Sequence, residues 1–522
     1  MAQPTLHRWD FTDSHLYQAL ANPFAEVAGI ADHPPARYLH CYLSDLGART
    51  FLVEQPYTDA DYLDDYSAYY CRCHAEFERH CKRLHFFDAE LTEKQLHAMR
   101  QGASKRLIRF LQKHYLGFVV ARPLPETVVG RTVLRTYGSE SGRREFPVAK
   151  TYKANLCGCE LEVSSLAFQE QDTVLAACAT VALWSSFHQT AELFQTAIPT
   201  PAAITRAATE AIHYGRPIPS SGLEIQEMCS AIRHLGLEPE LVDLRSGGMV
   251  PLPSLIYGYL FMGLPVVLVL EIVVGGQPGL HAVTVAGYSI AKQPVRQAEI
   301  PGYDFIPSVG RKIEKLYGHD DQIGPFARME IRDCPDDGFP LRLVTSWEDR
   351  HGTPYEVYPF AVIVPVYNKI RLRYIDVLQW LTRLDDVAAE VLPAQDEREW
   401  DVHLILSNKY KNVVRTDATR PLSVRESILS AHHPRFWWRA VLRLGGEPLV
   451  ELLFDATGIA RSLPLTETVW LSDAFAEKLE EQMAIPENES LIVEALGSQR
   501  LLRFLRDSIT RRSRPFDRAP EN

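Results

Sequence analysis

The sequence has no excess of positive charge and no long run of lysines or arginines. Its 522 residues contain 55 lysines and arginines against 66 aspartates and glutamates, which gives a formal net charge of −11. A protein that binds nucleic acid concentrates positive charge on one face, where it neutralises phosphates. No segment of this sequence provides such a face, so we expect no nucleic-acid partner.

Signals of secretion and of repeats are also missing. The first residues, MAQPTLHRWDFTDSHLYQ, lack the basic segment followed by an apolar segment that marks a secretory signal. The nine cysteines are an odd number scattered through the chain, whereas a disulfide framework needs even numbers. We see no internal repeat and no low-complexity segment. We therefore expect a reduced, cytoplasmic protein.

The longest apolar stretch, from Pro253 to Val274, contains one charged residue, Glu271. Its length could cross a bilayer. However, Gly263 and Pro265 interrupt it, and its second half is the β-branched run VVLVLEIVV. We therefore predict a buried helix, a tight turn and a buried strand, with no membrane contact.

Helix-like and strand-like segments alternate along the chain and predict an α+β protein with three regions. Residues 1–147 form the first, mixed α+β region. A hairpin is expected over residues 37–55 and a strand pair over 116–137, with helices over 61–84 and 92–114 between them. Residues 148–335 begin rich in helix and end in antiparallel strands, and residues 336–510 form a mixed α/β region. Residues 511–522 are expected to be a flexible tail.

One cysteine stands where a loop is expected to become a helix. In QDTVLAACATVALWSSFHQ, residues 171–189, alanines flank Cys178, and the apolar spacing that follows predicts a helix. A cysteine attacks as a thiolate, which unpaired backbone N–H groups at a helix N-terminus stabilise. The small neighbours would also let a substrate backbone approach. The alternative is an inert, buried cysteine.

A histidine and two acids follow Cys178 at the ends of predicted strands. His281 opens the strand HAVTVAGY after the polar loop GGQPGL, and the next strand ends in Asp320 and Asp321. A carboxylate there could orient the imidazole and stabilise its charged form. Gly318 would share a strand face with Asp320 and leave space for the histidine ring. We therefore favour Asp320 for this role and expect Asp321 to cap the turn that follows.

The order of these residues resembles that of the papain-like cysteine peptidases. The run GLPVVLVLEIVVGGQPGLHAVTVAGY is similar to the bacterial double-glycine leader (bacteriocin-processing) peptidases, and the resemblance spans roughly residues 165–335. It implies a papain-like core in which Cys178 is the nucleophile and His281 the base. Either Asp320 or Asp321 would orient the histidine. We recognise no family in the flanking regions.

The resemblance also implies a glutamine whose amide helps to hold the oxyanion. Gln171 is the candidate, seven residues before Cys178, which is one residue more than the family spacing. Gln169 lies further away. Ala179 stands where the family has glycine.

These residues predict a cysteine peptidase that hydrolyses a peptide or isopeptide bond of a protein or peptide substrate through a thioester. The same groups also serve amide-processing and acyl-transfer enzymes. A peptidase-like binding or regulatory module with a degenerate site is a further alternative. We expect no cofactor, and the sequence does not specify the oligomeric state or the cleavage preference.

Cysteines and histidines also crowd a predicted helix near the N-terminus, where zinc is conceivable. They are Cys71, Cys73, His74, His80, Cys81 and His85. However, residues 70, 73, 77, 81 and 84 form an apolar stripe at helical spacing, in which cysteine acts as a small hydrophobe. Paired CxxC motifs are missing, so we expect no metal there, nor at Cys157 and Cys159.

Overall fold

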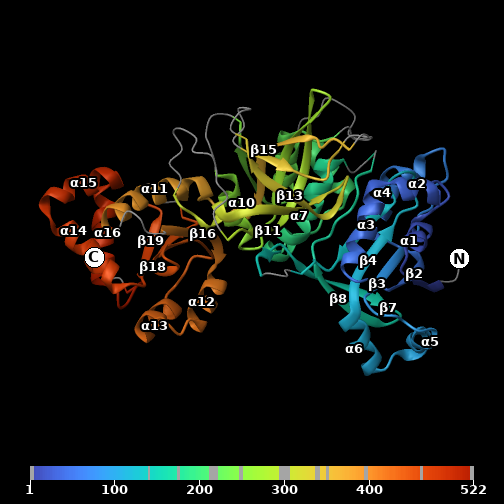
Figure 1. Ribbon diagram of the computed structural model, residues 1–522, viewed down its shortest axis with the longest axis horizontal. Helices are drawn as coiled ribbons and strands as arrows, with labels where there is room; N and C mark the ends of the chain where they lie inside the picture. Colours follow the sequence, from blue (N-terminus) through green and yellow to red (C-terminus); the bar gives the residue numbers. More distant parts are fainter. Residues whose placement is uncertain are drawn as a thin grey trace. The chain divides into compact units, whose positions relative to one another are not determined.

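The computed structural model describes residues 5–138, 142–172, 174, 177–210, 222–245, 251–292, 306–334, 341–348, 352–392, 398–458 and 463–517. Helices and strands are mixed along the chain, as the predicted α+β class requires (Figure 1). The chain forms two compact units. The first comprises Met1–Ser246, Gly263–Ser289 and Lys315–Val366, and the second comprises Gly247–Met262, Ile290–Glu314 and Tyr367–Asn522. The three-region division stays a prediction, because one compact unit can hold more than one domain.

The first unit begins with a five-stranded antiparallel sheet whose strands follow one another in chain order. Its strands are β1 (Thr5–Asp10), β2 (Thr50–Tyr57), β3 (Cys81–Phe87), β4 (Tyr115–Ala121) and β5 (Val129–Leu134). Six helices connect them: α1 (Asp13–Leu20), α2 (Val27–Asp32), α3 (Pro34–Asp45), α4 (Ala60–Ala68), α5 (Glu93–Gly102) and α6 (Lys105–His114). The strand pair predicted over residues 116–137 is confirmed, since β4 and β5 are antiparallel neighbours.

Two predictions for this sheet are wrong. Residues 37–43, expected as the first strand of a hairpin, lie in α3, which two prolines start and which buries one apolar stripe. The helix expected over residues 61–84 ends at Ala68, and residues 81–84 belong to β3. Strand β3 is central, with β2 and β4 on either side, and nearly all of its residues are buried. A short apolar run of this kind cannot be assigned to helix or strand from spacing alone.

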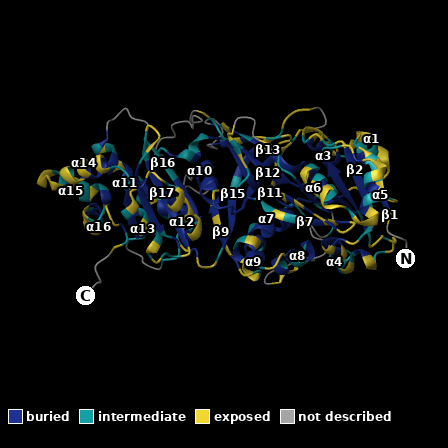
Figure 2. Ribbon diagram, turned by 90° about the horizontal axis from the view of Figure 1, so that it is seen from below, coloured by how far each residue is buried: buried dark blue, intermediate teal, exposed yellow. Residues whose placement is uncertain are grey.

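A closed six-stranded antiparallel barrel forms the other large sheet of the first unit. Its strands are β10 (Val266–Val274), β11 (Gln277–Ile290), β12 (Ile313–Asp320), β13 (Gly324–Asp333), β14 (Leu341–Val344) and β15 (Glu356–Val366). They pair in chain order, and β15 closes the barrel by pairing with β10. Two short strands extend the sheet, β9 (Glu238–Asp243) on β15 and β6 (Arg144–Glu145) on β11. Figure 2 shows β11, β12 and β13 largely buried.

The turn between β10 and β11 is shorter than predicted. Gly275 and Gly276 both have positive φ, which makes a two-residue turn possible, and Val274 pairs directly with Gln277. Strand β11 therefore begins at Gln277, and His281 lies inside the strand opposite Leu270 rather than at its start.

Helix α7 (Cys178–Phe194) packs against β10 and β15 of the barrel and is buried on almost all sides. It begins at Cys178, as predicted, and ends at Phe194; the next residue, Gln195, has a left-handed conformation and donates its N–H to the carbonyl of Ala191. Helices α8 (Pro201–Thr209) and α9 (Ile225–His234) pack beside α7, and the hairpin of β7 (Lys150–Leu156) and β8 (Cys159–Ser165) precedes it.

The apolar stretch from Pro253 to Val274 forms helix α10 (Leu252–Leu260), a turn and strand β10, as predicted. Helix α10 belongs to the second unit and β10 to the first. Within the described residues, no helix has the length and apolar character needed to cross a membrane.

The second unit contains a four-stranded antiparallel sheet, β16 to β19 in chain order. Its strands are β16 (Arg398–Leu406), β17 (Phe436–Leu444), β18 (Glu447–Asp455) and β19 (Leu465–Trp470). Its helices are α10, α11 (Tyr374–Val391), α12 (Ser407–Thr416), α13 (Leu422–Ser430), α14 (Asp473–Ala484), α15 (Pro486–Leu496) and α16 (Gln499–Thr510). Within the segment expected as a tail, Phe516 packs against the hydrophobic cluster around Trp437.

Candidate functional site

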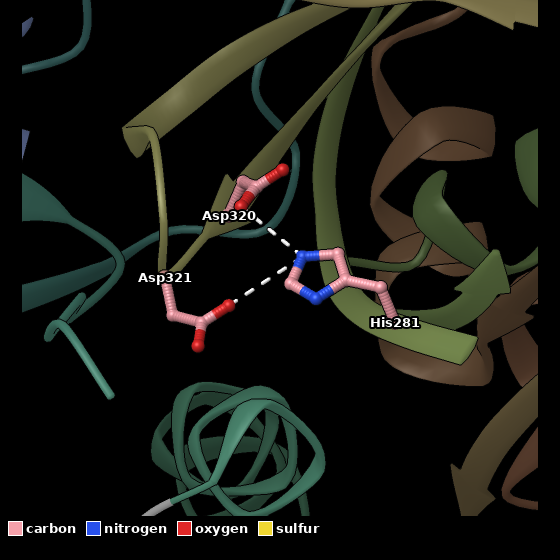
Figure 3. A group of neighbouring side chains, drawn as sticks. All are labelled: His281, Asp320 and Asp321. Atoms are coloured by element: carbon pink, nitrogen blue, oxygen red, sulfur yellow. Dashed lines mark hydrogen bonds and ion pairs between the residues drawn. The ribbon is translucent and has the colours of Figure 1, made fainter. Parts of the chain in front are cut away.

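Three segments far apart in the sequence bring Cys178, His281 and the two aspartates together. The Cys178 side chain lies close enough to the ring of His281 to help raise its pKa. Nε2 of His281 lies 3.1 Å from Oδ1 of Asp320 and 3.5 Å from Oδ1 of Asp321. Figure 3 shows this nitrogen facing both carboxyl groups, while the other ring nitrogen points away from them. Because Nε2 faces the carboxylates, Nδ1 is the nitrogen left for Cys178.

The position of Cys178 follows from how α7 begins and packs. Cys178 is the first residue of the helix, and the N-cap residue Ala177 has no side chain that could pair with the first backbone N–H groups. One turn further on, the carbonyl of Ala182 accepts a hydrogen bond of 2.6 Å from Oγ1 of Thr284. This bond fixes α7 against β11 close to His281. Cys178 itself is partly exposed.

His281 is almost completely buried, with 5% of the residue exposed. Burial alone lowers the pKa of the imidazole, but the charge and hydrogen bond of Asp320 outweigh it, and Cys178 and Asp321 add to the effect. The pKa of His281 is therefore held well above its usual value.

Asp320 is the carboxylate with a complete set of partners. Besides His281, it accepts hydrogen bonds from the indole N–H of Trp347 at 2.7 Å and from the backbone N–H of Gln322 at 3.1 Å. Burial favours the neutral acid, but the His281 charge and these hydrogen bonds outweigh it and lower the pKa of Asp320. Asp320 therefore remains an anion beside the imidazole.

Asp321 is as buried as Asp320 but lacks such partners. Neither of its carboxylate oxygens accepts a hydrogen bond from another residue in the described part of the chain. Burial is the main cause that raises the pKa of Asp321 to about 7, and the Asp320 charge adds to it while the His281 charge opposes it. The expected capping role is not seen, because the nearby backbone N–H of Gln322 bonds to Asp320 instead.

The space beside Gly318 is filled and does not receive the histidine ring. A Cβ atom at Gly318 would lie 2.9 Å from Cε of Met329 and 3.1 Å from the carbonyl oxygen of Thr284. Gly318 therefore does not make room for the histidine ring, and the prediction that it does is wrong. The geometry still places Asp320 closer than Asp321 to Nε2 of His281, and its role in turnover stays a prediction.

No family model matches this sequence, and no curated protein is significantly similar to it. The site must therefore be judged by its own geometry and chemistry.

Gln171 is partly exposed in the segment before α7. Among the described residues, no hydrogen bond joins it to Cys178 or His281. Gln169, two residues earlier, is buried, and its amide nitrogen has no partner within the described residues. The structure thus brings together the cysteine, the histidine and both acids, whereas the oxyanion role of Gln171 stays a prediction.

Sequence reasoning missed Trp347. Its indole N–H bonds to Asp320, and its ring packs edge-on against that of His281 with centroids 4.9 Å apart. Trp347 covers the ion pair of His281 and Asp320 and shields it from water, which strengthens the interaction. It lies 27 residues after Asp320 in the chain, and no local pattern points to this contact.

The cysteines and histidines of residues 71–85 do not converge on one point. Cys71 and Cys73 bond to backbone carbonyls one turn earlier, and His85 is buried in β3, where it bonds to the hydroxyl of Tyr115. Over the residues that the structure describes, the group whose ligand atoms lie close enough to hold a metal is His281, Asp320 and Asp321.

Proposed function

We propose that the protein is a cysteine peptidase with a papain-like core, in which Cys178, His281 and Asp320 form the catalytic triad. The observation that carries the proposal is the convergence of three side chains: Cys178 lies beside the His281 ring, and Nε2 of His281 faces Asp320. A nucleophile, a base and an orienting acid in this order are what acyl transfer to a cysteine requires.

The reaction that these groups support has two steps. His281 takes the proton of the Cys178 thiol, and the thiolate attacks the carbonyl carbon of the substrate. The resulting imidazolium donates this proton to the leaving amine as the C–N bond breaks and a thioester forms. Water, deprotonated by His281, then attacks the thioester and releases the acid and the free thiol.

Two further features support this proposal. The first backbone N–H groups of α7 are not capped by the side chain of Ala177, so they can stabilise the oxyanion of the tetrahedral intermediate. In addition, a helix that starts with the cysteine packs against an antiparallel barrel that carries the histidine and the acids. This arrangement is compatible with the proposed papain-like core.

The proposal is tested by digestion of a peptide library with the full chain. We expect cleavage by the native protein and none by Cys178→Ala. Cys73→Ala is the matched control, because Cys73 is also partly exposed, and it should cleave normally. Cleavage that survives in Cys178→Ala contradicts the proposal.

The products also separate hydrolysis from the alternative of acyl transfer. Library digestion in the presence of a free amine gives acids from a peptidase and new amides from a transferase. Equal alkylation of several cysteines at neutral pH, with no cleavage, would instead favour the alternative of a binding module.

A further inference from the structure

The Asp321 carboxylate is not explained by the triad. It is 2% exposed, both of its oxygens lack a hydrogen bond from another residue that the structure describes, and Oδ1 points toward Nε2 of His281 (Figure 3). A buried carboxylate without partners costs free energy, because nothing replaces the water that it loses. A triad needs one acid to orient the histidine, and Asp320 already has that position.

The three side chains are close enough together to hold a cation. Their ligand atoms, one from each residue, all lie within 4.8 Å of one another. Nε2 of His281 is 3.1 Å and 3.5 Å from the nearest oxygens of the two aspartates. Two ligands of a tetrahedral zinc ion with bonds of about 2.0–2.1 Å are about 3.3 Å apart. A cation between these atoms would therefore need little movement of the side chains.

We propose that His281, Asp320 and Asp321 form a binding site for one divalent cation of the zinc class. An imidazole nitrogen with two carboxylates is a ligand set that suits zinc. Calcium takes six to eight oxygen ligands and magnesium keeps several waters, and a buried set of three side chains supplies neither shell. The charge of the cation would match the two carboxylates and give the Asp321 oxygens the partner that they lack.

The consequence for activity rests on the proposed function. When a cation occupies Nε2, the remaining proton of the neutral imidazole is on Nδ1, the nitrogen left for Cys178. The ring then has no lone pair that could accept the thiol proton. Cation binding and catalysis therefore exclude each other, and the cation is a reversible inhibitor of the same site.

The site is tested on the full chain after treatment with a chelator. Zn²⁺ is titrated in competition with a chromophoric chelator, and Co²⁺ is used as a spectroscopic probe. We expect the native chain to bind one cation. The affinity of Asp321→Asn for this cation should be lower by a factor of about ten or more, because even the loss of an outer partner of a metal ligand commonly costs that much. Glu271→Gln is the matched control, because Glu271 is a barrel carboxylate already paired with Arg245, and it should bind like the native chain.

Two outcomes would overturn the proposal. One is a native chain that binds no cation, and the other is equal binding by the native chain and Asp321→Asn. A strong thiolate-to-cobalt charge-transfer band, unchanged in Asp321→Asn, would show that the cation sits on exposed cysteines instead. Tetrahedral cobalt absorption without that band is the expected result.

The same variants separate this proposal from the proposed function. Zn²⁺ should slow alkylation of Cys178 in the native chain but much less in Asp321→Asn. If the chain cleaves no peptide yet binds the cation through Asp321, the proposed function fails and the cation site stands. If it cleaves peptides and Zn²⁺ neither binds at Asp321 nor slows Cys178, the cation site fails and the peptidase stands.

Discussion

Replacing Asp321 with asparagine should stabilise the protein at neutral pH. Among the described residues, the carboxylate is buried without a hydrogen bond from another residue, and its pKa is raised from 3.8 to about 7 in the folded chain. When folding raises the pKa of a carboxyl group, that group destabilises the folded state at every pH above its pKa in the unfolded chain. The destabilisation grows as the pH rises toward the pKa in the folded chain. The difference between the two pKa values corresponds to about 4 kcal/mol near pH 7, and most of it disappears near pH 4.

The measurement is urea unfolding of the native chain and Asp321→Asn at pH 7 and pH 4, in buffer that contains a chelator. Asparagine keeps the shape of the side chain, so any contribution that is independent of pH cancels between the two conditions. We compare the free energy of unfolding of Asp321→Asn with that of the native chain at each pH. This difference should favour the variant by about 3 kcal/mol more at pH 7 than at pH 4. A gain that is equal at both pH values, or a loss at pH 7, refutes this account of Asp321.

Asp320→Asn is the matched control and should have the opposite sign. The pKa of Asp320 is lowered by His281 and by its hydrogen bonds, so its carboxylate stabilises the folded chain above the unfolded pKa, and this stability is lost as the pH falls. An asparagine amide would also direct an N–H group at either His281 or the indole N–H of Trp347. We expect a loss of about 1–3 kcal/mol at pH 7, the typical penalty for a buried group without a partner.

Three further outcomes are expected. Alkylation of Cys178 should remain fast in mildly acidic buffer, where ordinary thiols, with a pKa of about 8.5, react slowly, and His281→Ala should abolish this advantage when the rate is measured against pH. Glu451→Ala should cost roughly 3–5 kcal/mol in urea unfolding, since it leaves two buried arginines of the second unit without their carboxylate; a loss below about 1 kcal/mol would contradict this. Gly324→Ala should cost about 1–3 kcal/mol, because a Cβ there overlaps the ring of Tyr38, and Tyr38→Ala should remove most of that cost in the double variant.

Residues with a distinctive local setting could be predicted from the sequence. Cys178 was recognised by its small neighbours at a helix start, and the helix does begin there. His281 and the two aspartates were placed on neighbouring strands, and they do meet. The side of each strand was harder to predict, because a bulge between Gly318 and Asp320 shifts the register and thereby breaks the simple alternation of faces.

Contacts that depend on distant parts of the chain could not be predicted. Trp347 reaches Asp320 from a segment beyond β14, and only the closure of the barrel brings that segment back. Strand β3 has the apolar content of a helix stripe, and its type is decided by the strands on both sides of it. Tertiary pairing decided the structure in both cases, as is common for short apolar segments.

The two compact units exchange chain segments, and this limits how the protein can be cut. Shortening the chain after Val366 would remove the four-stranded sheet of the second unit but keep Gly247–Met262, which belongs to that unit. Helix α10 in this segment is buried along its whole length, and the hydroxyl of Tyr257 bonds to Asp401. The shortened chain would present that apolar helix to solvent, and the separate fragment 367–522 would lack it. A single recombination point or a single proteolytic cut therefore cannot separate the two units intact.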